Sequence, residues 1–289
     1  MPAILDCRAV AQKFLDLSAR LIKELEAPPV LATVLYRPEA HAASVQYRDL
    51  ILKDAAALGV AARKEEPHSE AELRRTLAEL NADPGVTGVM VFYPLGTRFH
   101  DEDVMDLVSP RKDVEGLHSV NLGYLIKYKR FLDEDLGVKC VVPATAKAVI
   151  KTLQHYPEIR VEGAFAAIVN NSMRVGKPLG LMLENLGATV VKCYDKTPRA
   201  VLEECVRRAD IVVTAVPDPA FRLNPAWVKP GAVVVDISYQ GNVDFPAGGF
   251  GGPSYATAPD NRIGRVTRAI MFVNLVYCAH QKRLPAAAL

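Results

Sequence analysis

The chain has 289 residues, of which 50% are hydrophobic and 24% are charged, and its 35 lysines and arginines exceed its 33 acidic residues by only two. This composition is that of a globular protein long enough to bury a core. A nearly balanced charge without a basic block gives no reason to expect nucleic acid or an anionic membrane surface as a partner, and no apolar run approaches the roughly 18 residues of a membrane span. A small molecule is therefore the expected ligand.

The beginning of the chain and its cysteines indicate a cytoplasmic protein. Asp6 comes early and no basic segment precedes an apolar one, so the first residues do not match a signal peptide. The cysteines are few, widely spaced and without a C-x-x-C pair, which argues against both a disulfide framework and a zinc site. They are Cys7, Cys140, Cys193, Cys205 and Cys278. The six histidines are also dispersed, so no metal is predicted.

In the first half of the chain, the hydrophobic pattern predicts helices that alternate with strands. Apolar residues recur at steps of three and four from Val10 to Leu25, which predicts a helix over residues 5–26. The other expected elements are a strand at 30–36, a helix at 40–58, a strand at 60–64, a helix at 69–81 and a strand at 86–93. Such alternation is typical of a parallel α/β layer, whose strands are buried on both faces.

A domain boundary is expected near residue 140, because residues 109–140 are less regular. After it, strands and helices alternate again in the manner of a Rossmann-like unit, with a glycine-rich loop and a final helix behind them. The expected elements are a helix at 146–156, a strand ending at Asn170, helices at 175–186 and 198–209, strands at 189–194, 210–216 and 231–237, a loop at 245–255 and a helix at 266–284.

The segment IVNNSMRVGKPLG, residues 168–180, joins a strand to a helix in this second part. In the G-x-G-x-x-G fingerprint, glycines let backbone N–H groups approach a pyrophosphate at a helix N-terminus. The three glycine places here hold Asn170, Ser172 and Val175, and Gly176 comes one step late. The pattern therefore fails as a match, and only its position indicates a nucleotide loop.

Asp195 follows the next expected strand and lies 19 positions after Gly176. An acid about 20 residues beyond a phosphate loop accepts hydrogen bonds from the adenosine ribose, and its charge repels the additional phosphate of NADP. The alternative is that Asp195 only caps a turn before Thr197 and Pro198. Spacing alone favours neither.

Several motifs resemble those of the methylenetetrahydrofolate dehydrogenase/cyclohydrolase family, in order and in spacing over roughly residues 5–280. They are VMVFYPLGT, SPRKDVEGLHSVNLGYL, VVPATAKAVIKTL, NNSMRVGKPLGLMLENLGATVV and GRVTRAI. The resemblance implies an α/β protein of two domains that forms a homodimer. Residues 1–140 are the expected folate-binding catalytic domain, completed by a C-terminal helix at 266–289 that packs back on it, and residues 141–265 are the expected Rossmann-like NAD-binding domain.

The resemblance also implies the cofactor. NADP-using members have Gly-Arg-Ser at 170–172, and that arginine together with a serine on the next strand holds the 2′-phosphate. This chain has Asn171 and Asp195 at those two positions, which indicates NAD. Asn170 is expected to preserve the turn, because asparagine tolerates left-handed backbone angles. The positions expected to contact NAD are Thr145, Asn170, Asn171, Ser172, Val175, Asp195, Val216, Ile237 and Thr267.

On the substrate side, bifunctional members have Y-x-x-x-K, in which the tyrosine packs on folate and the lysine drives hydrolysis. Tyr47 is present, but Ile51 occupies the lysine position. Lys53 cannot replace it, since six residues correspond to about 600° of helical rotation and a different face. The family glutamine is Phe92, whereas Glu115 keeps a carboxylate that accepts hydrogen bonds from the pterin. Tyr47 and Glu115 are therefore the expected catalytic residues.

These differences affect one of the two reactions. Hydride transfer from a carbon between two nitrogens requires mainly placement, whereas hydrolysis requires an activated water. The chain thus resembles the monofunctional branch of the family, which uses NAD to oxidise 5,10-methylenetetrahydrofolate to 5,10-methenyltetrahydrofolate. The alternatives are a bifunctional enzyme with NADP and a non-catalytic folate- or nucleotide-binding paralogue. The latter is suggested by PDNRIGRVT (259–267), which lacks the family's paired glycines.

Overall fold

The computed structural model describes residues 3–96, 100–244, 255–258 and 260–282. Most of the glycine-rich segment expected as a loop, residues 245–254, lies outside the described residues. The chain forms two compact units: one contains Met1–Gln12 and Thr145–Thr267, and the other contains Lys13–Ala144 and Arg268–Leu289. We call them the large-sheet unit and the small-sheet unit. The expectation of an α/β protein with two domains is confirmed.

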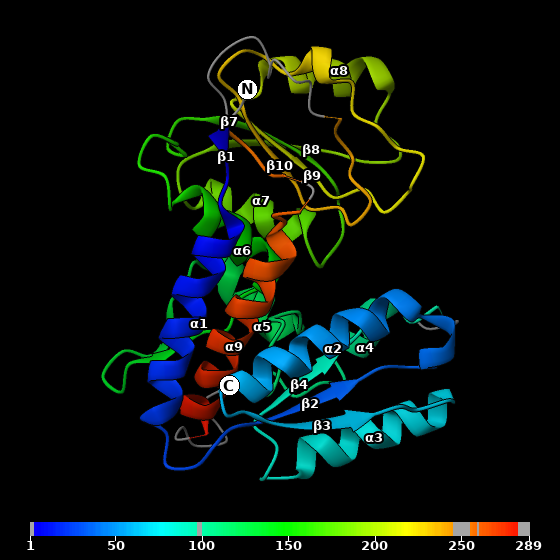
Figure 1. The fold of residues 1–289 in the computed structure, drawn as a ribbon, viewed down its shortest axis with the longest axis vertical. Coiled ribbons are helices and arrows are strands. Elements are labelled where there is room, and N and C mark those ends of the chain that lie inside the picture. Colours follow the sequence, from blue (N-terminus) through cyan, green and yellow to red (C-terminus); the bar gives the residue numbers. More distant parts are fainter. Residues whose placement is uncertain (1–2, 97–99, 245–254, 259, 283–289) are drawn as a thin grey trace. The chain divides into compact units, whose positions relative to one another are not determined.

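The small-sheet unit is built on three parallel strands in the order β3-β2-β4. The chain moves from β2 to β3 on one side, and then crosses to β4 on the other side of β2. Because such crossovers are right-handed, the two connecting helices belong on opposite faces of the sheet, and α2 and α3 flank it in Figure 1. The bounds are Val30–Val34 for β2, Ala42–Ala57 for α2, Ala61–Glu65 for β3, Glu70–Ala82 for α3 and Gly88–Val91 for β4.

Helix α9, Ile263–Gln281, closes the core of this unit with its part beyond Arg268. The amide of Asn274 donates to the carbonyls of Val114 (2.9 Å) and Val142 (3.0 Å), so it joins two loops at once. The expectation that the C-terminal helix packs back on the first domain is confirmed. The other elements of this unit, besides most of α1, are Pro38–Ala40 (η1), α4 at Asp101–Met105, α5 at Ser119–Ile126, and the hairpin of β5 at Phe131–Asp133 and β6 at Val138–Lys139.

The large-sheet unit contains six parallel strands in the order β1-β11-β10-β9-β7-β8. The chain runs from β7 to β8, and returns to place β9 on the opposite side of β7. Loops at such a reversal leave a crevice at the carboxyl ends of the strands, where α/β proteins bind ligands. The strands are β1 (Ala3–Ile4), β7 (Phe165–Val169), β8 (Thr189–Cys193), β9 (Ile211–Thr214), β10 (Val233–Asp236) and β11 (Tyr255–Ala256), and the helical elements are α6 (Ala144–Leu153), α7 (Gly176–Glu184), α8 (Arg199–Arg208) and η2 (Pro225–Trp227).

The first helix begins later than its hydrophobic pattern predicts. Helix α1 spans Cys7–Lys23, because the Asp6 carboxylate accepts from the backbone N–H groups of Arg8 (3.0 Å) and Ala9 (3.1 Å) and so caps its first turn. The two residues of β1 pair with β11 instead of joining the helix. As a result, residues 1–12 are grouped with the large sheet and not with the first domain of the sequence interpretation.

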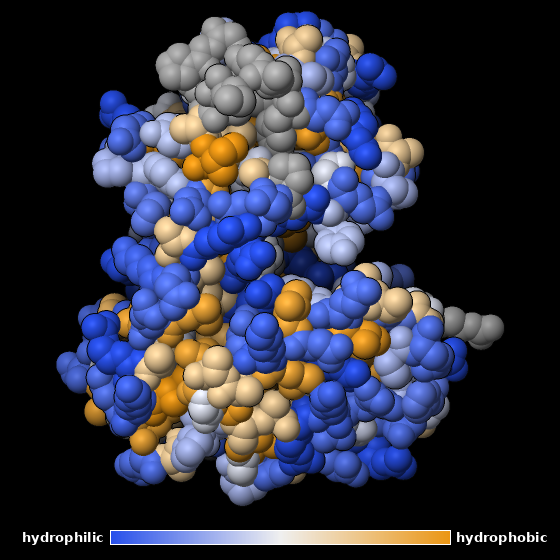
Figure 2. Space-filling view, in the orientation of Figure 1, coloured by the Kyte–Doolittle hydropathy of each residue, from blue (hydrophilic) through white to orange (hydrophobic). Residues whose placement is uncertain are grey.

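On the face drawn in Figure 2, hydrophobic residues of the small-sheet unit gather at its left and centre, and hydrophilic residues surround them. Within the part of the chain that the structure describes, no helix is both long and apolar enough to cross a bilayer.

Candidate active site

The loop between β7 and α7 is organised by the side chain of Asn170. Its Oδ1 accepts from the backbone N–H of Ser172 (2.9 Å), from the Ser172 hydroxyl (2.8 Å) and from the N–H of Gly176 (2.9 Å). Its Nδ2 donates to the carbonyl of Ala215 at the end of β9 (2.7 Å), so the amide also spans the point where the strand order reverses. The Ser172 hydroxyl then accepts from Val175 N–H (3.2 Å). One asparagine thus shapes the entire turn.

Asn170 keeps the turn as expected, but it does so without the left-handed backbone angles from which this was expected. Among the described non-glycine residues, positive φ angles occur only at Arg37 and Tyr128. Asparagine replaces the family glycine by hydrogen bonding and not by backbone freedom. Gly176 is needed for a different reason, since a Cβ there would lie 2.1 Å from the Asn170 carbonyl oxygen. The late glycine of the fingerprint therefore allows α7 to begin against the end of β7.

The loops after β9 and β10 are joined at the same edge of the sheet. Asn242 accepts from Val216 N–H (2.8 Å) and donates to the Val216 carbonyl (3.1 Å). Asp236, the last residue of β10, accepts from the backbone N–H groups of Asn242 (2.5 Å) and Ser238 (3.0 Å), on either side of a turn that begins at Ile237. The expected cofactor positions at the ends of β7, β9 and β10 are therefore tied together by the side chains of Asn170, Asn242 and Asp236, of which the motif comparison singled out only Asn170.

Asp195 lies just beyond the carboxyl end of β8, and its side chain is 74% exposed. The turn before Pro198 is closed by Thr197, whose hydroxyl accepts from Tyr194 N–H at 2.9 Å. The Asp195 carboxylate pairs instead with Lys196, at 3.1 Å. This strand end therefore presents an exposed acceptor, which forms a surface ion pair with the neighbouring lysine.

Thr145 and Thr267 lie at the two ends of the segment Thr145–Thr267 that forms most of the large-sheet unit. Thr145 is the second residue of α6, and the Thr267 hydroxyl donates to the carbonyl of Ile263 within α9 (3.2 Å). Their contacts to a cofactor stay predictions.

The segment that replaces the family's glycine-rich loop is held within the large-sheet unit. Asp260 pairs with Arg8 (3.2 Å), and Asn261 donates to Asp6 (3.3 Å). Arg262 donates to the carbonyl of Ser238 (2.9 Å), and its guanidinium lies 5.7 Å from the centre of the Tyr239 ring. Each of the three residues that interrupt the glycine pattern thus makes a polar contact within the large-sheet unit.

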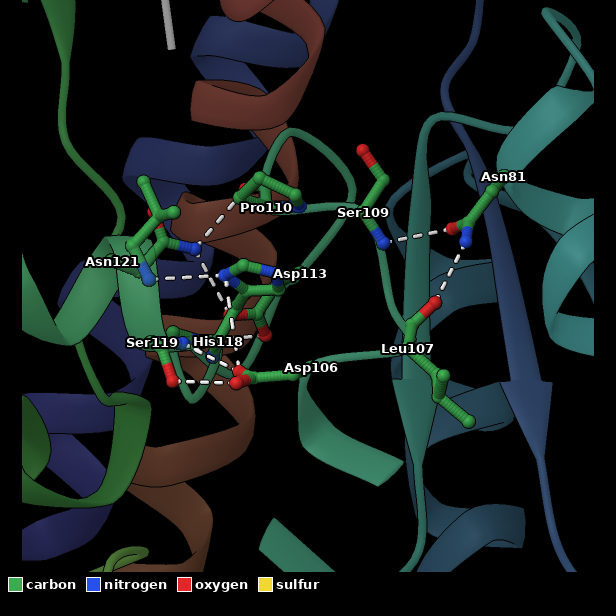
Figure 3. Close-up of polar contacts among 11 residues, drawn as sticks. Asn81, Asp106, Leu107, Ser109, Pro110, Asp113, His118, Ser119 and Asn121 are labelled. Carbon is green, nitrogen blue, oxygen red and sulfur yellow. Dashed lines mark hydrogen bonds and ion pairs between the residues drawn. The ribbon is translucent and has the colours of Figure 1, made fainter. Parts of the chain in front are cut away.

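The turn that carries Glu115 is built on the buried carboxylate of Asp113 (Figure 3). Asp113 accepts from the backbone N–H groups of Glu115 (3.2 Å), Gly116 (2.9 Å) and His118 (2.8 Å) and from Asn121 Nδ2 (2.9 Å). Burial raises the pKa of Asp113, and these hydrogen bonds oppose that rise. The half-buried Glu115 side chain is therefore presented from a rigid turn.

Close backbone packing fixes the same turn from the other side. Gly116 has a φ of +72°, and a Cβ there would lie 2.4 Å from the backbone of Val142. The Glu115 carbonyl accepts from Ala144 N–H (3.1 Å) at the start of α6. Next to it, His118 Nδ1 accepts from Val120 N–H (3.0 Å) and caps α5, while Asp106 accepts from Ser119. The first carboxylate of the motif, Asp113, is thus used by the turn.

The expected folate-contacting residues of α2 and β4 come together in the small-sheet unit. The rings of Tyr47 and Phe92 lie edge to face, with centroids 6.4 Å apart and planes at 83°. Phe92 is 5% exposed and Ile51 is fully buried, whereas Tyr47 is half-buried. The two positions that differ from the bifunctional pattern are therefore apolar and closed to water, beside an aromatic ring that remains accessible.

The sequence interpretation did not predict one charged pair beside this ring. Arg268 Nε donates to Asp54 Oδ2 at 2.7 Å, and their side chains are 11% and 22% exposed. The only sequence signal was the spacing of Asp54, which lies seven residues after Tyr47 and so on the same face of α2. Nothing in the local sequence indicated that its partner comes from a helix 214 positions away.

Together these features define a class: a two-domain α/β protein with a nucleotide-type loop where the order of a parallel sheet reverses, and a second unit that presents an acidic turn and an accessible tyrosine. Family models identify the chain more narrowly. The catalytic domain of tetrahydrofolate dehydrogenase/cyclohydrolase matches residues 5–115, and the NAD(P)-binding domain of the same family matches residues 143–283. The chain belongs to the tetrahydrofolate dehydrogenase/cyclohydrolase family, as its motifs predict.

Individual relatives agree with this membership. The bifunctional protein FolD of Xanthomonas euvesicatoria pv. vesicatoria is 34% identical over 291 residues, which cover 96% of this chain and 91% of that protein. A 5,10-methylenetetrahydrofolate dehydrogenase from the silkworm Bombyx mori is similar in structure, with a TM-score of 0.85, 28% identity and coverage of 98% and 99%. The bifunctional FolD of Campylobacter jejuni has a TM-score of 0.81, 27% identity and coverage of 98% and 100%.

Proposed function

We propose that this chain is an NAD-dependent 5,10-methylenetetrahydrofolate dehydrogenase that forms 5,10-methenyltetrahydrofolate and hydrolyses it weakly or not at all. We place it in the cytoplasm because its cysteines are few and scattered, and we expect a homodimer from the family resemblance. Asp195 carries the cofactor assignment. It is an exposed carboxylate just beyond the strand that follows the nucleotide loop, and it forms a surface ion pair with Lys196, the adjacent cation.

The residues of the large sheet fit a dinucleotide without a 2′-phosphate. Asn170 and Gly176 bring the start of α7 close to the end of β7, which directs a helix N-terminus at the expected pyrophosphate position. Asp195 accepts hydrogen bonds from ribose hydroxyls and disfavours a phosphate at the same place, and Asn171 supplies no charge to attract one. NAD, when bound, supplies a hydride acceptor. Thr145, Ser172, Val175, Val216, Ile237 and Thr267 are the further residues that we propose to hold it.

The small-sheet unit places the substrate. Glu115 accepts hydrogen bonds from the pterin amino and ring N–H groups, which fixes the orientation of the bicycle. Tyr47 packs on the folate through the accessible part of its ring. Because the nitrogens beside the reacting carbon already stabilise a developing cation, this placement is the main contribution that the chain must make to hydride transfer.

The two positions that serve hydrolysis in bifunctional relatives hold no comparable residues in this chain. A general base or proton shuttle must stand within hydrogen-bond reach of the attacking water. Ile51 and Phe92, at the positions of the family lysine and glutamine, offer no polar atom and are buried. The alternative is bifunctional activity with NADP, which requires another residue to act as base. The printed names of the FolD relatives support the bifunctional part of this alternative.

The proposal is tested by mixing the protein with methylenetetrahydrofolate and either NAD or NADP, and following the absorbance of the reduced nucleotide and of methenyltetrahydrofolate. Faster turnover with NAD, with methenyltetrahydrofolate accumulating, is expected. Faster turnover with NADP and enzyme-dependent loss of the methenyl signal would support the bifunctional alternative. Absence of turnover with both nucleotides would favour a non-catalytic paralogue.

Replacing Glu115 with glutamine is expected to weaken folate binding by about tenfold or more, since one hydrogen bond to a charged group is worth about 1.5–3 kcal/mol. The amide must offer N–H groups toward donors on the pterin. Titration of tetrahydrofolate by calorimetry measures the loss, and NAD affinity should not change. Glu115→Asp, which keeps the acceptor on a shorter chain, is the control and should bind better than Glu115→Gln. Unchanged folate affinity in Glu115→Gln would assign Glu115 to the turn alone.

A further inference from the structure

One face of helix α2 carries three residues in a row. Tyr47, Ile51 and Asp54 follow one another at steps of four and three, which places them on the same side of the helix. Asp54 is therefore one turn beyond the position where bifunctional relatives have a lysine. Arg268 reaches this face from α9 and donates through Nε to Asp54 at 2.7 Å.

The same guanidinium contacts the aromatic pair. The Arg268 Cζ lies 5.9 Å from the centre of the Tyr47 ring, within the range of a cation–π contact. Phe92 packs edge to face against the same ring, with 6.4 Å between centroids. Tyr47 is thus constrained from two directions, by a cation and by an aromatic ring, while part of its surface remains accessible.

A gain in stability does not explain the ion pair. Its side chains are 11% and 22% exposed, and charges at this depth lose hydration that their mutual attraction only partly restores. A planar guanidinium held by a carboxylate does give a fixed orientation, which a flexible ammonium does not. Asp54 therefore fixes the plane of Arg268, and Arg268 restricts the orientations that the Tyr47 ring can adopt.

We propose that Arg268, held by Asp54, is a positioning residue that sets the Tyr47 ring in the orientation required to pack on the folate substrate. The proposal rests on the function proposed above. Removing the guanidinium takes away one of the two contacts that constrain the ring, so that part of the binding free energy is used to order it. Because this contact is made equally to bound substrate and to the transition state, its loss raises KM for the folate and leaves kcat nearly unchanged.

The test is a double-mutant cycle between Arg268→Met and Tyr47→Ala, measured by steady-state kinetics. Arg268→Met alone is expected to raise KM for methylenetetrahydrofolate by about fivefold to tenfold, with KM for NAD unchanged. In the Tyr47→Ala background, Arg268→Met should have no additional effect, since no ring remains to be positioned. Arg268→Lys should restore only part of the affinity, and Asp54→Asn should reproduce part of the loss.

Lys53→Met is the matched control, because it removes an exposed cation from the residue beside Asp54. It should leave KM unchanged. The proposal is overturned if Arg268→Met costs the same with and without the Tyr47 ring, if kcat falls instead of KM rising, or if the Lys53→Met control has an equal effect. Should Arg268→Met not fold, Arg268→Lys and Asp54→Asn carry the same cycle.

Calorimetric titration with tetrahydrofolate separates this proposal from the function on which it rests. An unmodified protein that produces no reduced nucleotide would refute the proposed dehydrogenase. If that protein still binds tetrahydrofolate, the cycle is measured in dissociation constants, and coupling between Arg268 and Tyr47 still supports the positioning role. No binding of tetrahydrofolate by the unmodified protein refutes both.

Discussion

Exchanging Asp195 for serine and Asn171 for arginine is expected to shift the ratio of kcat/KM for NADP over NAD by about 100-fold toward NADP. Serine removes the repulsion of the 2′-phosphate, and arginine adds a charged donor to it. Each change is worth about 1.4 kcal/mol or about tenfold, the low end for charged hydrogen bonds because Asp195 is mostly exposed and its interactions are screened by solvent. Initial rates at varied nucleotide concentrations measure the ratio.

The ion pair of Asp195 with Lys196 predicts that the effect of Asp195→Ser on cofactor preference depends on the residue at position 196. Asp195→Ser removes the partner of Lys196, so this lysine can then contact the phosphate. Combining Asp195→Ser with Lys196→Gln should therefore remove part of the gain, and Lys196→Gln alone should change the preference little. A higher kcat/KM with NADP than with NAD in the unmodified protein would refute the cofactor assignment.

Replacing Ile51 with lysine is expected to make the decay of methenyltetrahydrofolate measurably dependent on the enzyme. The cation lies one turn from both Tyr47 and Asp54 on α2, so it reaches the face that lines the expected substrate site. Only partial activity is expected. Ile51 is fully buried, a lysine there loses hydration, and Phe92 still offers no polar atom. Decay of the methenyl absorbance, corrected for spontaneous hydrolysis, is the measurement.

Ile51→Met is the control, because it has similar volume and no charge and should leave the decay at the rate in buffer. Adding Phe92→Gln to Ile51→Lys should increase the decay further. Lysine at 51 also competes with Arg268 for Asp54, so the variant should show a higher KM for the folate as well. If the unmodified protein already hydrolyses the product rapidly, another residue supplies the base and the monofunctional assignment is wrong.

Hydrophobic periodicity was sufficient to predict the alternation of strands and helices in both units, because buried parallel strands and amphipathic helices have different repeats. It did not predict β1 or β11, since two-residue strands have no period. The start of α1 depended on a single capping carboxylate, Asp6, which an apolar pattern does not register. The hydrophobic pattern therefore could not predict a helix start that is set by a capping side chain, or a short strand that forms only by pairing with a distant one.

Prediction of the candidate site from the sequence had the same limit. Motif spacing brought out Glu115, Tyr47 and Asp195, which occupy the turn, the helix and the strand end expected for them. Spacing did not show that Asn170 works through its side chain, because a one-letter pattern treats it as a failed glycine. Arg268 was missed because its role depends on a contact between α2 and α9, which only the folded chain brings together.

The small-sheet unit is discontinuous in sequence, and this has a consequence for biosynthesis. Its core includes Leu275, whose Cδ1 would lie 2.7 Å from a Cβ at Gly88, and Asn274, which joins the loops at Val114 and Val142. A ribosome makes residues 13–144 early, but it makes the part of α9 from Arg268 onward only after the entire segment from Thr145 to Thr267. During translation the apolar surface that α9 covers in the small-sheet unit therefore stays exposed. A nascent chain that stalls before α9 presents this surface to chaperones.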